Sequence, residues 1–491
     1  MVTLHLNSTS WSMNIKHQVT RLQPNEVRIP NKIDWSCLAS TKFEQPDERL
    51  RLSLSTFENQ RDCGSESVAA ILFGNGSDCD LSLLTRRRSA GAVPLGAKYR
   101  LIDGVVSNCI HSNITKMYAL TQFNSTSLNS HLTRAYSNFG LGKDHFLQVI
   151  AACQTPQNQT WFQGNADAIR RFLWMLEDSP VTDFLILPGY HLYRMNYQEI
   201  LHFHQQTTAD ITISALISEQ TNDKGFGILT VNSDNQVLNG SKSGQSDLLQ
   251  VGSRLVENCK DNKCTTYASM GIYVIKKEAL VKILKEDFPW ANDFSSEVIP
   301  GAISIGMKVK AHLFDGYWEN MQSIKGFYEA NMESTKTTDI RYDFCHRDFP
   351  LYTLARRLPP TRVLDSLISD SSIGDGCILN NCRIKGSVIG HGTRIEDAVV
   401  IEDSILMGSD IYQEDLVPLM KKKKSTIRIG IGQGSFVRKA IIDKNARIGR
   451  RVMIINKDNI QEGNRKDQEF VIRDGIVIIT KSAIIPDDTI L

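Results

Sequence analysis

Isoleucine recurs every five or six residues near the end of the chain, and this spacing restricts the fold more than any other feature. Members such as Ile373, Ile389 and Ile405 lie 16 residues apart. A repeat of this length, with small residues between, is typical of a parallel β-helix whose coils stack their isoleucines inside. A β-sandwich would instead alternate every two residues and carry hairpin turns. The series comprises Ile368, Ile373, Ile378, Ile384, Ile389, Ile395, Val400 and Ile405.

The region before this repeat alternates apolar runs with an amphipathic stretch. Residues 165–178 place Ala166, Ile169, Phe172, Leu173 and Leu176 on one helical face. Strands alternating with helices imply a mostly parallel sheet that is covered on both faces, so we expect an α/β domain here. The expected strands are residues 68–74, 116–122, 145–152, 183–189, 210–216 and 267–275.

The composition limits the kind of partner that the chain can have. A net charge of +2 argues against a dedicated nucleic-acid surface, and the dense basic run Lys421–Lys424 is typical of a solvated loop. No run of about 18 apolar residues exists, so no membrane span is expected. The 10 cysteines lack metal-type pairing, which favours reduced thiols.

The first residues carry a separate signal. Residues 1–25 contain no Asp or Glu but include Lys16 and Arg21, a pattern that fits either an organelle transit peptide or a disordered tail. We therefore expect a transit peptide and disordered N-terminus over residues 1–65. The α/β domain is expected over 66–332, a connector over 333–362 and the β-helix domain over 363–491.

Nine segments, in order, resemble the small subunit of plant plastidial ADP-glucose pyrophosphorylase. The resemblance covers about residues 67–491 and implies a nucleotidyltransferase-like domain, a left-handed β-helix and a location in the plastid stroma. The segments are "VPLGAKYRLID" (93–103), "VSNCIHSNI" (106–114), "LTQFNSTSLNSHL" (120–132), "WFQGNADA" (161–168), "HLYRMNY" (191–197), "ASMGIYVI" (268–275), "NDFSSEVIPGA" (292–302), "DGYWE" (315–319) and "IIDKNARIG" (441–449).

The resemblance also implies a reaction. The family joins ATP to glucose 1-phosphate and releases ADP-glucose and pyrophosphate, with the sugar phosphate attacking the α-phosphorus in line. The protein contributes positioning and charge neutralisation more than covalent chemistry. A Gly-rich loop with an arginine, a nearby lysine, two aspartates that hold Mg²⁺ and a Glu-Lys-Pro segment do this work in the family.

Two of the phosphate-binding parts are altered in this sequence. In the loop "GNGSDCDL" (74–81), Gly74 and Gly76 remain, but Asp80 stands where the family has its arginine. In "SAGAVP" (89–94), Gly91 belongs to the pair that replaces the family's Lys-Pro. The basic run Arg86–Arg88 just upstream either substitutes for the lost charges or is an exposed turn.

Both metal aspartates are replaced as well. Tyr190 stands in the family's Gly-Asp-His-Leu-Tyr motif, and Asn320 in its Trp-Glu-Asp-Ile-Gly-Thr motif. A neutral phenol, with an ordinary pKa near 10, is a poor Mg²⁺ ligand, and an amide offers only a carbonyl oxygen. Lys242 is the remnant of the sugar-phosphate segment, with no glutamate beside it. We expect no intact catalytic residue and no bound metal or other cofactor.

Other family positions are retained. Gln163, Gly164, Ser269 and Glu297 match positions near the base and sugar, although each also fits a turn or a core role. Lys444 and Lys481 match the lysines through which the family responds to 3-phosphoglycerate and phosphate. An anion site is therefore expected there, unless the two lysines simply persist on a stable scaffold.

Three hypotheses follow from these residues. The first is a catalytically inactive small-subunit homologue that assembles with large subunits. The second is an active nucleotidylyltransferase in which Glu319 and Arg86–Arg88 rebuild the site. The third is a regulatory or assembly subunit that binds only 3-phosphoglycerate or phosphate.

Overall fold

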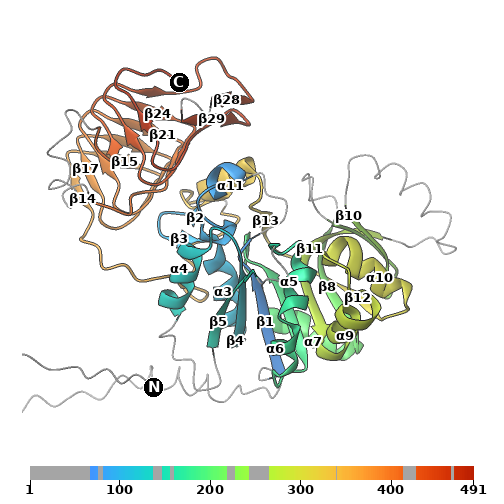
Figure 1. Cartoon of the computed structure of the whole chain (residues 1–491). Helices are drawn as coiled ribbons and strands as arrows, with labels where there is room; N and C mark the ends of the chain where they lie inside the picture. The colour runs from blue at the N-terminus through green and yellow to red at the C-terminus, as the bar shows by residue number, and fades with distance from the viewer. Residues whose placement is uncertain are drawn as a thin grey trace, which may run out of the picture. The chain divides into compact units, whose positions relative to one another are not determined.

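A computed structural model describes residues 67–75, 81–136, 146–154, 160–217, 227–242, 265–338, 340–412, 427–465 and 469–491, without the side chains of 241 and 242. The expected N-terminal segment (1–65), Gly76, Asp80 and Lys421–Lys424 lie outside these ranges. Within them, the chain forms an α/β domain and a parallel β-helix (Figure 1). The expected fold class is confirmed.

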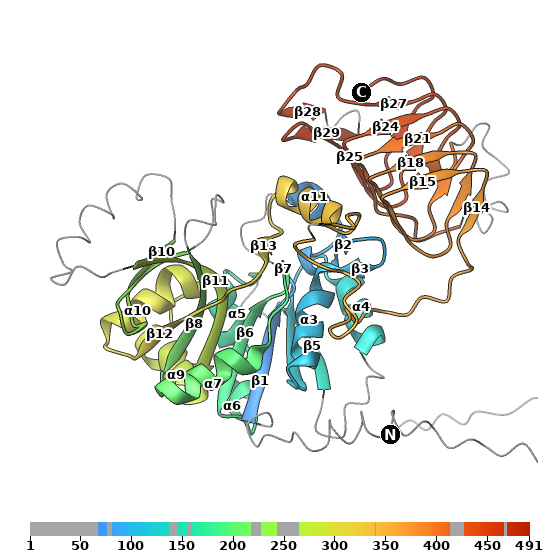
Figure 2. The ribbon, with the colours of Figure 1, turned by 180° about the vertical axis from the view of Figure 1, so that it is seen from behind.

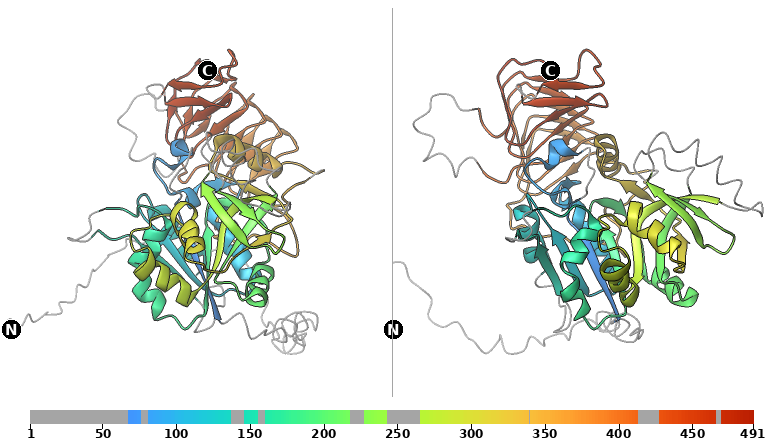
Figure 3. Two further views of the ribbon diagram at one scale, coloured as in Figure 1. Left: turned by 90° about the vertical axis from the view of Figure 1, so that its right-hand side faces the viewer. Right: turned by 45° about the vertical axis from the view of Figure 1, so that its right-hand side comes forward.

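A parallel sheet forms the first half of the α/β domain. Strand β1 (Val68–Phe73) pairs in parallel with β4 (Lys116–Thr121) on one side and β6 (Asp183–Pro188) on the other, and β5 (Phe146–Ala151) pairs with β4. Every residue of β1 and β6 is buried, because helices cover both faces of the sheet (Figure 3).

Alternate residues of β1 belong to two different cores. Ile71 packs with α5 (Asn165–Arg171) and α6 (Leu173–Glu177), whereas Leu72 packs with α3 (Leu101–His111), α4 (Thr126–Tyr136) and α7 (Tyr197–Thr207). The helix expected over 165–178 is thus two helices, interrupted at Phe172, whose φ of −112° is not helical. Four members of the expected apolar face, Ala166, Ile169, Leu173 and Leu176, are buried, whereas Phe172 at the interruption is only half-buried.

One long strand joins the second half of the sheet to the first half, and it runs antiparallel to the strands on either side of it. Strand β11 (Thr265–Lys276) pairs with β6, β8 (Ile211–Ile217) and β9 (Gly227–Val231), and β8 also pairs in parallel with β12 (Val309–Leu313). The remaining elements of this domain are α2 (Ser82–Thr85), η3 (Ala90–Ala92), β2 (Pro94–Leu95), β3 (Tyr99–Arg100), β7 (His191–Tyr193), β10 (Val237–Lys242), α9 (Lys277–Lys282), η5 (Ile283–Asp287), η6 (Phe294–Val298), α10 (Ile299–Ser304), β13 (Trp318–Asn320) and α11 (Ile324–Glu333).

Short strands stack in register to form the β-helix (Figure 2). Three sheets result, because each coil contributes one strand to each. The first contains β14 (Arg362–Leu364), β17 (Ile378–Asn380), β20 (Arg394–Ile395), β23 (Gly430–Ile431), β26 (Arg447–Ile448) and β31 (Ile484–Ile485). The second contains β15 (Leu367–Ser369), β18 (Arg383–Lys385), β21 (Val400–Glu402), β24 (Phe436–Arg438) and β27 (Met453–Ile454). The third contains β16 (Ser372–Ile373), β19 (Val388–Ile389), β22 (Ile405–Leu406), β25 (Ala440–Ile442), β30 (Ile476–Ile479), β29 (Phe470–Arg473) and β28 (Gly463–Arg465).

The expectation that the whole isoleucine series points inside is wrong at several positions. Ile378 and Val400 are half-buried, and their neighbours Leu379 and Ile401 fill the interior instead. Ile405 is buried on the outside of the coil, whereas Ile368 is 37% exposed because the first coil has a neighbour on one side only. The repeat predicts the strands correctly, but a period of five to six does not fix which residue of each pair faces inward.

One stripe on the outside of the third sheet is apolar and buried. Val388, Ile405, Ile441 and Ile478 are aligned in register along the stack. They belong to a single apolar cluster with residues of the α/β domain, which we call the seam cluster. Its α/β members are Leu81, Leu84, Val93, Leu95, Leu101, Leu192, Met321, Ile324, Phe327 and Ala330, its connector members are Tyr342, Phe344 and Leu351, and its other β-helix members are Met407 and Ile476.

The connector is held to the α/β domain by a buried carboxylate. Asp103 in α3 is fully buried and accepts hydrogen bonds from the backbone N–H of Arg100 (2.9 Å), His131 (2.5 Å), Tyr136 (2.8 Å) and the hydroxyl of Thr353 (2.6 Å). One side chain therefore links α3, α4 and the connector. No helix among the described residues is both long and apolar enough to span a membrane.

The substitution Asp103→Asn should weaken this junction. An amide offers one acceptor oxygen where the carboxylate offers two, so buried donors lose partners, and we expect a loss of about 3 kcal/mol in unfolding free energy. Urea denaturation measures the loss. The control is Asp397→Asn at an exposed position of the β-helix, where the change should stay within about 0.5 kcal/mol. Equal stability of the two variants would contradict the assigned role.

Candidate functional site

Three glycines meet where β1 and β6 end. Gly74 follows β1 and Gly189 follows β6, and the Gly189 N–H donates to the carbonyl of Phe73 (2.9 Å). Gly91, in the short helix η3, donates its N–H to the carbonyl of Gly74 (2.9 Å). The structure thus brings Gly74 and Gly91 together at the C-terminal edge of the sheet, which is where open α/β sheets bind ligands.

Close packing at this edge leaves little room around Gly91. A Cβ atom there would lie 3.3 Å from the carbonyl oxygens of both Gly74 and Gly189. Ala90 is only 4% exposed, so the segment in which the family has Lys-Pro is packed against the strand ends. Gly76 and Asp80, from the same loop, lie outside the described residues.

Tyr190 lies next to this edge and packs against the seam cluster. Its ring meets the ring of His191 edge-on, with centroids 4.8 Å apart. The short strand β7 follows Tyr190 and pairs antiparallel with β13. Asn196 caps the next helix, α7, because its side chain accepts from the N–H of Gln198 (3.1 Å).

Asn320 lies beside Tyr190 because β13 places it opposite His191. It is buried, with 7% of its surface exposed. Its carbonyl oxygen accepts from the backbone N–H of Gln322 (3.1 Å), and its NH₂ group donates to the side chain of Gln322 (3.2 Å). The fold therefore brings together the two positions at which the resemblance implies metal aspartates, and the amide of Asn320 is turned toward its own strand end.

These residues do not fit a Mg²⁺ ion. Such an ion requires a carboxylate or several oxygen ligands, whereas here a phenol packs among apolar side chains and an amide oxygen already accepts a hydrogen bond. Across the described part of the chain, no group of three or more His, Cys, Asp or Glu residues could hold a metal.

His191 is a residue of this region that the sequence did not single out. It is buried between Tyr190 and Trp318, whose ring lies 4.9 Å from its own. Burial lowers the pKa of His191 to about 3, and a hydrogen bond to the backbone of Met270 only partly opposes this effect. A single histidine within "YHLY" carries no sequence signal that would separate it from a core residue.

Two of the positions that the resemblance places near the base and sugar have local structural roles. The backbone N–H of Gln163 donates to Asp167 (3.0 Å), and the Gln163 amide donates to the carbonyl of Trp161 (2.9 Å). Glu297 accepts from the N–H of Asn292 (2.8 Å) and so closes the turn before η6.

The other retained positions are likewise held within the fold. Ser269 accepts from the N–H of Gly271 (3.2 Å), where β11 changes register and Gly271 has a φ of +71°. Gly164 allows close packing, because a Cβ atom there would lie 2.2 Å from the carbonyl oxygen of Asn292. Lys242 ends β10, and its side chain lies outside the described atoms.

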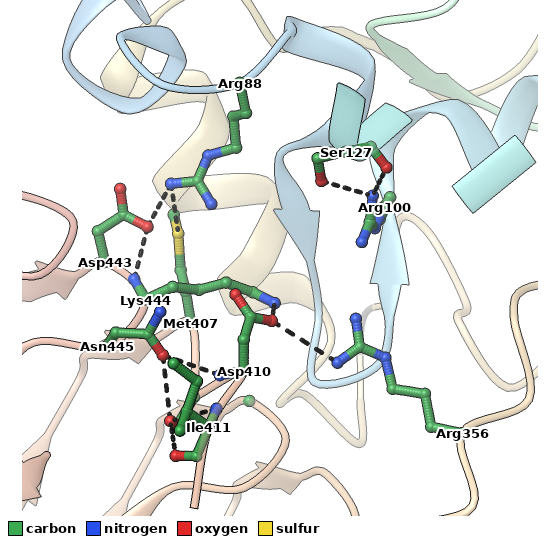
Figure 4. Close-up of polar contacts among 12 residues, drawn as sticks. Arg88, Arg100, Ser127, Arg356, Met407, Asp410, Ile411, Asp443, Lys444 and Asn445 are labelled. Carbon is green, nitrogen blue, oxygen red and sulfur yellow. Dashed lines mark hydrogen bonds and ion pairs between the residues drawn. The ribbon is translucent and has the colours of Figure 1, made fainter. Parts of the chain in front are cut away.

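Cationic side chains gather around Lys444 (Figure 4). Lys444 donates to Asp410 (2.5 Å), and Arg356 lies 3.9 Å from the same carboxylate. Burial lowers the pKa of Lys444 to about 8, an effect that Asp410 opposes and that Arg356 and Arg100 strengthen.

Lys481 and Arg88 belong to the same neighbourhood. Lys481 lies on the next coil, where the N–H of Ser482 donates to the carbonyl of Lys444 (2.9 Å). Arg88 forms a buried ion pair with Asp443. The structure thus brings Lys444 and Lys481 together, and it adds Arg100, Arg356 and Asp410, which sequence reasoning missed because they come from three distant segments.

Comparison with known proteins gives the class to which this fold belongs. A family model described as "Nucleotidyl transferase" matches residues 69–337, and one described as "GLGC left-handed parallel beta-helix domain" matches residues 356–490. The chain is therefore a nucleotidyltransferase-fold protein with a left-handed β-helix domain.

Two curated relatives narrow the class. "Inactive glucose-1-phosphate adenylyltransferase small subunit 2, chloroplastic" from Arabidopsis thaliana is 55% identical over 441 residues, covering 89% of this chain and 92% of the relative. "Glucose-1-phosphate adenylyltransferase small subunit, chloroplastic/amyloplastic" from Triticum aestivum is 46% identical over 433 residues, covering 87% and 92%. The chain belongs to the glucose-1-phosphate adenylyltransferase small-subunit family, as the sequence motifs predicted.

The packing at Gly164 predicts a large effect of a small substitution. In Gly164→Ala the new methyl group would overlap the carbonyl of Asn292, so we expect a loss of about 2 kcal/mol in unfolding free energy. Gly104→Ala is the matched control, because a Cβ atom there meets nothing within 4 Å and the position is helical. It should be neutral or stabilise by up to about 1 kcal/mol. Denaturant midpoints compare the two, and equal losses would contradict the prediction.

The buried His191 predicts a dependence of stability on pH. Its pKa of about 3 in the folded protein lies below the ordinary value of 6.5, so the unfolded chain binds more protons between these limits. Stability should therefore fall as the pH falls from 6.5 toward 3. His191→Gln should remove on the order of 2 kcal/mol of the loss at pH 4.5. His202→Gln, at an exposed position of α7, is the control. Identical pH profiles of wild type and His191→Gln would refute the assignment.

Proposed function

We propose that this protein is a catalytically inactive small-subunit homologue of glucose-1-phosphate adenylyltransferase that acts as an assembly or regulatory subunit in plastids. The main observation is the pair Tyr190 and Asn320. They lie side by side through β7 and β13, one packed among apolar side chains and the other bonded to Gln322. The family's motifs have Mg²⁺-binding aspartates at these positions.

Several further observations support inactivity. Ala90 and Gly91 pack tightly on the strand ends where the family has a lysine. The relative that is 55% identical is named as inactive. In-line transfer depends on neutralising the charge of the triphosphate, so the loss of metal and cationic groups together removes the main source of rate enhancement.

An active enzyme with a rebuilt site is the alternative. It would need Arg86–Arg88 as phosphate ligands, but Arg88 is buried and bonded to Asp443 and to the carbonyl of Leu84. One carboxylate, that of Glu319, would also have to replace two. No observation favours this alternative.

The assembly role rests on the retained family architecture. Both relatives are named as small subunits of a chloroplastic or amyloplastic enzyme, which supports large subunits as partners and the plastid as location. Lys444 and Lys481, held together with Arg100 and Arg356, support a response to 3-phosphoglycerate or phosphate.

Formation of ATP from ADP-glucose and pyrophosphate tests inactivity directly. We expect no turnover from the wild type and none from Tyr190→Asp alone, because one carboxylate restores neither the second metal ligand nor the phosphate cations. Turnover is expected only when Tyr190→Asp is combined with Asn320→Asp and Asp80→Arg. A fully active wild type or single variant would overturn the proposal.

Co-expression with a large subunit completes this test. The two chains should co-purify, and any turnover of the complex should disappear when the active site of the large subunit is mutated. Turnover that survives that mutation would mean that the present chain is catalytically active. Failure to co-purify would contradict only the assembly role.

A further inference from the structure

The cationic groups around Lys444 already face a carboxylate from the chain itself. Asp410 Oδ1 lies 2.5 Å from Lys444 Nζ and 3.9 Å from Arg356 (Figure 4). The Lys444 side chain is only 12% exposed, and that of Asp410 is 39% exposed. A charge-assisted hydrogen bond of this kind, sheltered on the lysine side, is stronger than an exposed surface ion pair.

The chain around Asp410 is built to hold this carboxylate in place. The side-chain oxygen of Asn445, the residue after Lys444, accepts from the Asp410 N–H (2.8 Å) and from the Ser409 hydroxyl (3.1 Å). Tyr412 donates to the carbonyl of Gly376 (3.0 Å) on the other side. Asp410 is therefore fixed by contacts on two coils of the β-helix as well as by its charge.

The other cations of the cluster act on the same carboxylate. Burial raises the pKa of Asp410, but Lys444, Arg356 and Lys481 together lower it below its ordinary value. Arg100, which donates to the carbonyl and hydroxyl of Ser127, also interacts with Asp410. Asp410 thus lies where the fields of these four cations converge, which is the position an anionic ligand would take.

We infer that Asp410 is a built-in competitor for anions, whose carboxylate must leave Lys444 before a phosphate group can bind there. The inference rests on the proposed anion response and specifies its regulation. A phosphate dianion can displace the carboxylate because it brings more charge and more acceptor oxygens to the same cations. A ligand with a single weak negative charge gains nothing by the exchange.

The substitution Asp410→Asn tests the competition. It removes the charge but keeps the backbone N–H that bonds to Asn445, so the segment stays anchored. Calorimetric titration of the full chain with inorganic phosphate should show binding at least about tenfold tighter than in the wild type, since one charge-assisted hydrogen bond is typically worth that factor or more. Lys444→Met in the Asp410→Asn background should abolish the gain.

Two further variants serve as controls for this titration. Asn445→Ala keeps the Asp410 charge but removes the contacts that position it, and it should give a smaller gain in phosphate affinity. Asp488→Asn breaks the exposed ion pair with Arg451 and should leave phosphate affinity unchanged. The melting temperature of each variant shows whether it is folded.

The outcomes separate the inference from the proposed function. Unchanged or weaker phosphate binding in Asp410→Asn overturns the competitor role, and weaker binding would make Asp410 a positioning residue for Lys444. Absence of phosphate binding in every variant overturns both the competitor role and the anion site. Catalytic inactivity and assembly with a large subunit are tested separately, by the turnover assay and by co-purification, so the phosphate titration does not decide either of them.

Discussion

The buried ion pair between Arg88 and Asp443 sets the arrangement on which both candidate sites depend. Arg88 also donates to the carbonyl of Leu84 (2.9 Å), and Asp443 accepts from the backbone N–H of Lys444 (2.6 Å). Breaking a buried pair by removing one partner typically costs about 3–5 kcal/mol. The pair therefore fixes the segment before η3 to the coil that carries Lys444, while the seam cluster supplies the apolar contact around it.

The replacement of two carboxylates that the family resemblance implies at Tyr190 and Asn320 is compatible with an intact fold, because neither position needs a carboxylate for its contacts. Paired carboxylates repel each other without a cation, so a scaffold that no longer binds metal gains nothing from keeping them. Here one position packs apolar surface and the other is satisfied by a neighbouring amide. Tyr190 and Asn320 thus make the same kinds of packing and hydrogen-bond contacts as other residues of the fold.

Much of this was predictable from sequence, for reasons that differ between the domains. The buried runs at β1 and β6 and the five-to-six-residue repeat predicted both architectures, since periodicity reports directly on burial. The outward stripe of Val388, Ile405 and Ile441 was missed, although adjacent apolar pairs such as Ile405–Leu406 indicate a strand buried on both faces. Asp410 could not be predicted, because its role depends on a fold that places it over Lys444 from 34 residues away.

The first coil of the β-helix has a dynamic consequence. Its strands β14 and β15 have a neighbouring coil on one side only, and Leu367 is 72% exposed there. In a stack where each coil contacts mainly its neighbours, local stability is set by how many faces are covered. Amide hydrogens of the first coil should therefore exchange through local opening at a low free energy. Those of β22 and β25, covered by coils above and below and by the seam cluster outside, should exchange only when the whole domain unfolds.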